Sequence, residues 1–131
     1  MSQGFTITKT DGPVTVLHLG GHLDSQAEPE VVEAARQTHA AGVRFLVADL
    51  SGVEMITSAG LRALHTIYKQ FTPHEEVEAW QKEHADQVFK SPHFKLTGAS
   101  PEVHYVLSIS GFLQNLPIYP NLQDALNSFP K

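Results

Sequence analysis

Hydrophobic residues alternate with polar ones in some stretches of this chain and recur at helical spacing in others, and these changes mark its elements. The pattern predicts five strands, at residues 4–10, 14–19, 43–50, 94–98 and 116–119, of which the third is continued by an extended segment at 53–56 and the last is an edge strand. It predicts helices between them: one that ends near 41, one at 58–71, an extra one at 73–89 and one from 100 that stops at 111. A last helix follows residue 121. Strands that alternate with helices favour a mostly parallel sheet. The Asp11–Gly12 turn makes the first two strands an antiparallel hairpin.

The segment between the second strand and the first helix carries several boundary signals. Gly20–Gly21 is expected to end the strand, either through unusual dihedral angles or through a close approach of the backbone. Ser25 and Glu28 match a capping box at the start of the helix. Asp24 has two interpretations: it is a helix-start residue, or its carboxylate forms part of a surface that a partner recognises.

The most continuous apolar strand runs from Val43 to Leu50, and Asp49 near its end is expected to cap a turn at Ser51–Gly52. Residues 57–60, Thr-Ser-Ala-Gly, then lead into a helix. Peptide N–H groups at a helix start are unpaired and the helix dipole is positive there, so Ser58 can act as a cap or can carry a phosphate in a favourable field. The apolar stripe predicted for this helix consists of Leu61, Leu64, His65 and Tyr68. The stripe predicted for the helix after residue 100 consists of Val103, Val106, Leu107 and Ile109.

Residues 72–92 form an additional segment in which Val77, Trp80, His84 and Val88 recur at helical spacing. One interpretation is a decoration packed against the edge of the domain. The other is a surface for a partner or for a homodimer, anchored by Trp80. A metal site is not expected, because His74 and His84 are ten residues apart and do not share a helical turn.

Composition narrows the function classes. A chain of 131 residues is expected to form a single domain, residues 1–131, and it has no apolar run of the ~20 residues that cross a bilayer. The first residues lack the basic and apolar parts of a signal peptide, and there is no cysteine, so a cytoplasmic location is expected. The net charge of −5 argues against binding to nucleic acid or an acidic membrane. No glycine-rich phosphate loop and no fixed Ser-His-Asp set are found, so neither an enzyme nor a cofactor is predicted.

Four stretches in a fixed order resemble one family. They are Leu-Gly-Gly-His-Leu-Asp at 19–24, Phe-Leu-Val-Ala-Asp-Leu-Ser-Gly-Val at 45–53, Ile-Thr-Ser-Ala-Gly-Leu-Arg at 56–62, and the segment 98–112, which begins Gly-Ala-Ser-Pro-Glu-Val and ends Leu-Ser-Ile-Ser-Gly-Phe. Together they are similar to the STAS family, especially the small bacterial anti-sigma-factor antagonists. The resemblance implies an α/β fold with a small mixed, mostly parallel sheet of about five strands and helices packed chiefly on one side. The extra helix at 73–89 lies within an insertion at 72–92.

The resemblance also implies functional residues. Ser58 matches the serine that a partner kinase phosphorylates in the family, and Asp24 matches an aspartate beside it. Phosphorylated members usually carry aspartate immediately before that serine, whereas this chain has Thr57. The expected partner-binding surface comprises Asp24, Thr57, Ser58, Ala59, Gly60 and Arg62.

By the same resemblance, the unmodified protein is expected to bind an anti-sigma factor, often itself a serine kinase, and so to release a sigma factor. The kinase would use its own ATP and magnesium to phosphorylate Ser58 and end the binding, unless the surface acts as an unregulated adaptor. The alternative is a STAS adaptor subunit of an ABC lipid transporter or of a stress-signalling complex.

Overall fold

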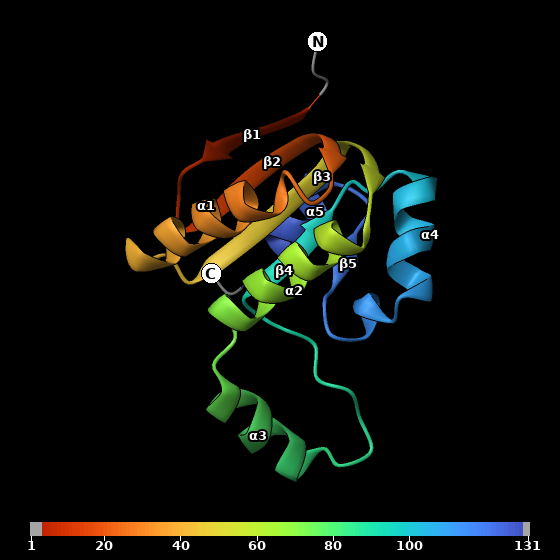
Figure 1. Ribbon diagram of the computed structural model, residues 1–131. Coiled ribbons are helices and arrows are strands. Elements are labelled where there is room, and N and C mark those ends of the chain that lie inside the picture. Colours follow the sequence, from red (N-terminus) through yellow and green to blue (C-terminus); the bar gives the residue numbers. More distant parts are fainter. Residues whose placement is uncertain (1–3, 130–131) are drawn as a thin grey trace.

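The computed structural model describes residues 4–129 and contains one five-stranded sheet in the order β1-β2-β3-β4-β5 (Figure 1). The elements are β1 (Phe5–Thr10), β2 (Val14–Leu23), α1 (Glu28–Ala40), β3 (Phe45–Ile56), α2 (Ser58–Phe71), α3 (His74–Glu83), β4 (Phe94–Thr97), α4 (Pro101–Ile109), the 3-10 turn η1 (Phe112–Gln114), β5 (Ile118–Tyr119) and α5 (Leu122–Asn127). β1 pairs with β2 in antiparallel fashion, and the three other pairings are parallel. The predicted mixed, mostly parallel sheet with an opening hairpin is confirmed.

Helices cover the two faces of the sheet unequally. The larger apolar cluster joins Leu17, Leu46 and Leu96 of the sheet to residues of α1, α2 and α4, including Val31, Leu64 and Leu107. A smaller cluster on the opposite face joins Val16 and Val47 to Ala125 of α5 and to Phe129. The prediction that helices pack chiefly on one side is therefore confirmed, with α5 as the helix on the other side.

A buried lysine fastens α5 to its face of the sheet. The Nζ atom of Lys95, on β4, donates to the carbonyl oxygen and the hydroxyl of Ser128 at 3.1 and 2.9 Å. It lies 4.3 Å from the centre of the Phe129 ring, which is a cation–π geometry. Burial lowers the pKa of this ammonium group. The oxygen atoms of Ser128 and the ring of Phe129 thus stabilise the lysine charge, and the same contacts hold these two residues against β4.

The predicted end of β2 at Gly20–Gly21 is wrong, because the strand continues to Leu23. The register against β3 shifts on both sides of this glycine pair. Gly21 has a φ of +83°, and a Cβ atom at this residue would lie 2.1 Å from the carbonyl oxygen of Gly4. The glycines therefore allow the close backbone approach that their sequence predicts, and they carry the strand through an irregularity instead of ending it.

Local signals predicted some helix boundaries and missed others. Ser100 and Asn121 cap α4 and α5 as expected, through Val103 N–H and Asp124 N–H. The capping box of Ser25 and Glu28 is wrong: the N-cap of α1 is Ala27, with no side-chain hydrogen bond. The reason lies in Asp24, whose carbonyl oxygen already accepts from the N–H groups of Ala27 and Glu28.

Two predicted apolar stripes need correction. On α2 the buried residues are Ala59, Gly60, Ala63, Leu64, Ile67 and Phe71. His65 is exposed, so its place in the predicted stripe is wrong. On α4, Val103 and Leu107 are buried but Ile109 is 65% exposed. The sequence of α4 is apolar on more than one side, so helical spacing alone did not identify its inner face.

The extra helix is present but shorter than the predicted 73–89. α3 ends at Glu83, where the N–H of the next residue, His84, closes the helix on Trp80 and Gln81. The chain then turns, so that Phe89 packs edge-on against Trp80 with ring centres 5.6 Å apart. Val88 lies outside the helix and is 54% exposed. In Figure 1, α3 projects from the rest of the molecule, and its base is fastened by the buried hydrogen bond of Thr72 to Ser91 at 2.9 Å.

Candidate functional site

The junction of β2, β3 and α2 is organised by Thr57. Its backbone N–H donates to the carbonyl oxygen of Leu23 at 3.1 Å, so the ends of β2 and β3 are joined just before α2 begins. The backbone of Thr57 is extended, and its hydroxyl oxygen accepts from the N–H of Gly60 at 3.4 Å, which makes Thr57 the N-cap of α2. The same hydroxyl donates to the carbonyl of Leu23 at 3.4 Å. Thr57 therefore caps α2, and the Ser58 side chain is not needed as a cap.

Ser58 is the first residue of α2 and is exposed to solvent. Within residues 4–129, its hydroxyl has no hydrogen-bond partner. The first N–H groups of the helix point toward this end and give it a partial positive charge. An accessible hydroxyl at this position can be modified or contacted without unfolding the helix.

Asp24 lies at the same junction. It follows Leu23 directly, and Leu23 is bonded to Thr57, so Asp24 and Ser58 are each one residue beyond the same backbone hydrogen bond. The Oδ1 atom of Asp24 accepts from the N–H groups of Gln26 and Ala27 at 3.0 and 3.2 Å. Asp24 thus begins the turn into α1, as the first interpretation predicts, and the residue is half-buried.

Ala59 and Gly60 are buried and support the turn from beneath. A Cβ atom at Gly60 would lie 2.2 Å from the carbonyl oxygen of Leu23 and 2.8 Å from the side chain of Ile56. The family resemblance places Gly60 in the expected partner-binding surface. The geometry assigns it to packing of α2 against the end of β2.

Arg62 does not project freely into solvent. Its guanidinium group forms two hydrogen bonds to the Glu28 carboxylate, each 2.8 Å long, and so connects α2 to α1. The hydrogen bond from Arg62 lowers the pKa of Glu28. This partner could not be predicted from the sequence, because Glu28 and Arg62 are 34 positions apart and no local pattern links them. The pair forms a rim beside the exposed serine.

A second polar arrangement crosses three strands of the sheet. The Nε2 atom of His18 lies 2.9 Å from the Thr10 hydroxyl, and its Nδ1 atom lies 2.8 Å from Oδ2 of Asp49. The other carboxylate oxygen accepts from the N–H of Ser51 at 3.0 Å. The turn predicted at Ser51–Gly52 is wrong, because β3 runs without interruption from Phe45 to Ile56 and Asp49 bonds Ser51 within the strand. The order hydroxyl, imidazole, carboxylate was not apparent in the sequence. Here it links β1, β2 and β3, because each residue belongs to a different strand.

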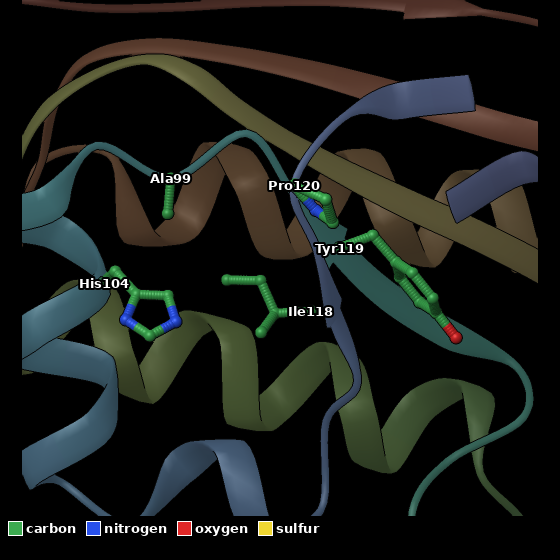
Figure 2. A pocket seen from close by; sticks show the side chains of 5 residues that line it. All are labelled: Ala99, His104, Ile118, Tyr119 and Pro120. Carbon is green, nitrogen blue, oxygen red and sulfur yellow. The ribbon is translucent and has the colours of Figure 1, made fainter. Parts of the chain in front are cut away.

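A pocket of about 370 Å³ lies apart from the Ser58 turn, and Ala99, His104, Ile118, Tyr119 and Pro120 line it (Figure 2). In this view Ala99, His104 and Ile118 converge, whereas the ring of Tyr119 points away from them. None of its lining residues is acidic, and none belongs to the predicted partner-binding surface. The pocket therefore adds no group to the chemistry of that surface.

Within residues 4–129, no group of three or more histidine, cysteine or acidic side chains is placed to hold a metal ion. Across the same part of the chain, none of the helices combines the length and the apolar character that crossing a membrane requires.

Comparison with known proteins points to one family. The STAS domain model matches residues 5–76, which is more than half of the chain. No curated protein matches the sequence. Among solved structures, the chain is similar to an anti-sigma factor antagonist from Mycobacterium paratuberculosis, with 25% identity, a TM-score of 0.75, and coverage of 95% of this chain and 93% of that one.

Two more distant structures share the fold. A STAS domain protein from Planctomyces limnophilus, described as an anti-sigma-factor antagonist, has 21% identity and a TM-score of 0.64, with 93% of this chain and 95% of that chain covered. The phosphorylated form of SpoIIAA from Bacillus has 14% identity and a TM-score of 0.58, with 95% and 97% covered.

Proposed function

The chain belongs to the STAS domain family, and on this premise we propose that it acts in the cytoplasm as an anti-sigma-factor antagonist. In this proposal the unmodified protein binds an anti-sigma factor through the turn at Asp24, Thr57 and Ser58. The partner then no longer holds its sigma factor. Ala59 and Gly60 are buried and hold the turn in place, and the ion pair of Arg62 with Glu28 forms the edge of the proposed binding surface.

One observation carries this proposal: the Ser58 hydroxyl is exposed and unbonded at the first position of α2. A serine that served only as a cap would direct its oxygen toward the N–H groups of the next turn. That role belongs to Thr57, which bonds the N–H of Gly60. The serine oxygen is therefore available to an external protein.

We further propose that the partner is a serine kinase and that it ends the complex by phosphorylating Ser58. A phosphoserine carries about −1.5 to −2 charges at neutral pH. The free N–H groups at the start of α2 would stabilise this charge within the folded chain. Against a partner surface shaped for a neutral hydroxyl, burying the charge costs several kcal/mol, and each 1.4 kcal/mol weakens binding about tenfold. SpoIIAA, which shares the fold, exists in a phosphorylated form.

Thr57 is compatible with such a switch. Threonine and aspartate are both effective N-caps, so α2 keeps its start with either residue. The difference is electrostatic, because threonine leaves one negative charge fewer beside the serine. The unphosphorylated turn is then less acidic than in relatives that have aspartate here.

The binding proposal is tested by recovering partners from a native lysate with four baits: wild type, Ser58→Ala, Ser58→Asp and the control Thr8→Asp. Thr8 is an exposed hydroxyl residue on β1, so this control adds the same charge away from the turn. Wild type, Ser58→Ala and Thr8→Asp are expected to recover the same small ATP-binding anti-sigma factor. Ser58→Asp is expected to recover at least about tenfold less of it.

The outcome separates the two functions that the family resemblance left open. Equal recovery by Ser58→Asp and wild type contradicts a switch at this residue. Recovery of a transporter ATPase by all four baits, without an anti-sigma factor, contradicts the antagonist proposal and supports an adaptor subunit.

A further inference from the structure

Helix α4 presents apolar side chains to solvent as well as to the core. Val103 and Leu107 are 1% and 0% exposed and pack against the sheet. On the other side, Tyr105 and Ile109 are 64% and 65% exposed. A helix that is apolar on opposite sides is usually covered on both, because leaving apolar side chains in water is unfavourable in free energy.

The exposed side of α4 continues onto the end of β3. A groove of about 110 Å³ separates the two elements and is lined by Glu54, Met55, Ile56, Glu102, Val103 and Val106. Met55 is 42% exposed. Among the side chains that the structure describes, which do not include Phe112, four large hydrophobic ones are exposed, and three of them, Met55, Tyr105 and Ile109, belong to this surface. We call Met55, Glu102, Tyr105, Val106 and Ile109 the α4 outer face.

The residues of the α4 outer face share one side of the helix. Glu102, Tyr105, Val106 and Ile109 are spaced i, i+3, i+4 and i+7, which is one stripe of an α-helix. Figure 1 shows α4 at the margin of the molecule, away from α1, α3 and α5. Such a stripe can accept another segment without rearrangement of the fold.

The charge around this stripe is negative. Glu54 is exposed over 76% of its side chain, and Glu102 is exposed as well. Neither α4 nor the end of β3 from Val53 to Ile56 contains lysine or arginine. One histidine, His22, lies 3.7 Å from Glu54, and a second, His104, is on α4 itself. Two accessible carboxylates therefore flank an apolar groove.

From this combination we propose that the α4 outer face binds an amphipathic, basic segment of another protein. Its apolar side chains would cover Met55, Tyr105 and Ile109. Its lysine or arginine side chains would pair with Glu54 and Glu102. This surface lies beyond the Ser58 turn and does not require Ser58 to be phosphorylated, but the two adjoin, since Met55 is only three residues before Ser58.

Other occupants fit the charge less well. A symmetric contact between two copies would bring the carboxylates of both α4 outer faces together, and like charges at an interface oppose association. An acidic membrane surface would repel the same carboxylates. A basic partner segment uses the apolar and the acidic residues at once.

The test uses the full chain, labelled with ¹⁵N, and a synthetic 14-residue helical peptide made of leucine and lysine. A matched peptide of leucine and glutamate is the control ligand. Amide shifts caused by the basic peptide are expected at Met55, Glu102, Tyr105 and Ile109. The acidic peptide is expected to leave the spectrum unchanged.

Variants connect the binding to the surface. The double variant Tyr105→Ser/Ile109→Ser removes two exposed apolar side chains and is expected to weaken binding of the basic peptide at least about tenfold. The double variant Glu54→Gln/Glu102→Gln is expected to weaken it a few-fold and to reduce its dependence on salt. Val88→Ser removes an exposed hydrophobic side chain that lies outside the α4 outer face, and this variant is expected to bind like the wild type.

Three results would overturn the inference: shifts confined to other elements, equal binding of the acidic peptide, or an equal loss with Val88→Ser. A wild-type dimer in sedimentation that Tyr105→Ser/Ile109→Ser converts to a monomer would identify a second copy as the occupant instead. Because Ser58 takes no part in the assay, a failure here is separate from a failure of the phosphorylation proposal.

Discussion

The Asp49 carboxylate is a single group whose ionisation is coupled to folding. Burial is the largest single effect and raises its pKa, but the hydrogen bond from His18, the bonds from Ser51 and the charge of the imidazole together lower the pKa below its ordinary value. The folded state therefore binds the proton more weakly than the unfolded chain. The stabilisation is present above the ordinary pKa of aspartate, about 3.9, and is lost as the pH falls through the lower pKa of the folded state.

We predict that Asp49→Asn lowers the free energy of unfolding by about 1–3 kcal/mol at pH 7, because His18 and Ser51 lose a charged acceptor. The difference from wild type should shrink as the pH falls below about 4, because the carboxylate of the unfolded chain then takes up a proton before that of the folded protein. Urea unfolding at a series of pH values measures both effects. The control is Asp86→Asn, since Asp86 is exposed. A constant difference between wild type and Asp49→Asn across this pH range would refute the coupling.

For single residues, the position of Ser58 could be predicted from the sequence, whereas the long-range side-chain pairs around the site could not. The hydroxyl of Ser58 could be placed at a helix start from the apolar pattern on each side of it. The bonds of Arg62 to Glu28 and of His18 to Asp49 could not, because they join residues 34 and 31 positions apart. Such pairs depend on which strands and helices become neighbours, and that information is not local.

Among the elements, α2 depends on the absence of a side chain at Gly60. We predict that Gly60→Ala destabilises the protein by at least about 2 kcal/mol, because the added methyl group would meet the backbone of Leu23, which cannot move without shifting β2. Thermal and urea unfolding measure this loss. Gly12→Ala adds the same methyl group where the nearest heavy atom is 3.3 Å away, so it should change stability far less. Equal stability of the two variants would show that α2 is not anchored at Gly60.

The boundaries of the elements show where local rules were sufficient. The caps of α4 and α5 were predicted because Ser100 and Asn121 bond N–H groups in their own first turns. The start of α1 was predicted wrongly at Ser25, because the path of β2 places Asp24 where its oxygens take the first N–H groups. α3 ends early for a similar reason, since the contact of Trp80 with Phe89 requires the chain to turn back.

In the molecule as a whole, the sheet was easier to predict than the binding role of the molecular surface. Alternation, the hairpin turn and the spacing between strands together predict a five-stranded, mostly parallel sheet, and the structure has one. The role of α4 was harder to assign, because Tyr105 and Ile109 are apolar yet face solvent. Hydrophobicity in a sequence indicates that a side chain will be covered, but not whether its own chain or another protein covers it.

The central claim concerns the exposed hydroxyl where β3 passes into α2. Its most direct test is intact-mass measurement and phosphosite mapping after the purified protein is incubated with native lysate and ATP, with Ser58→Ala treated in parallel. The account predicts that the wild-type protein gains one phosphoryl group, located at Ser58, and that Ser58→Ala gains none. A phosphoryl group at another residue in both proteins, or a wild-type protein that stays unmodified while it binds an anti-sigma factor, would contradict it.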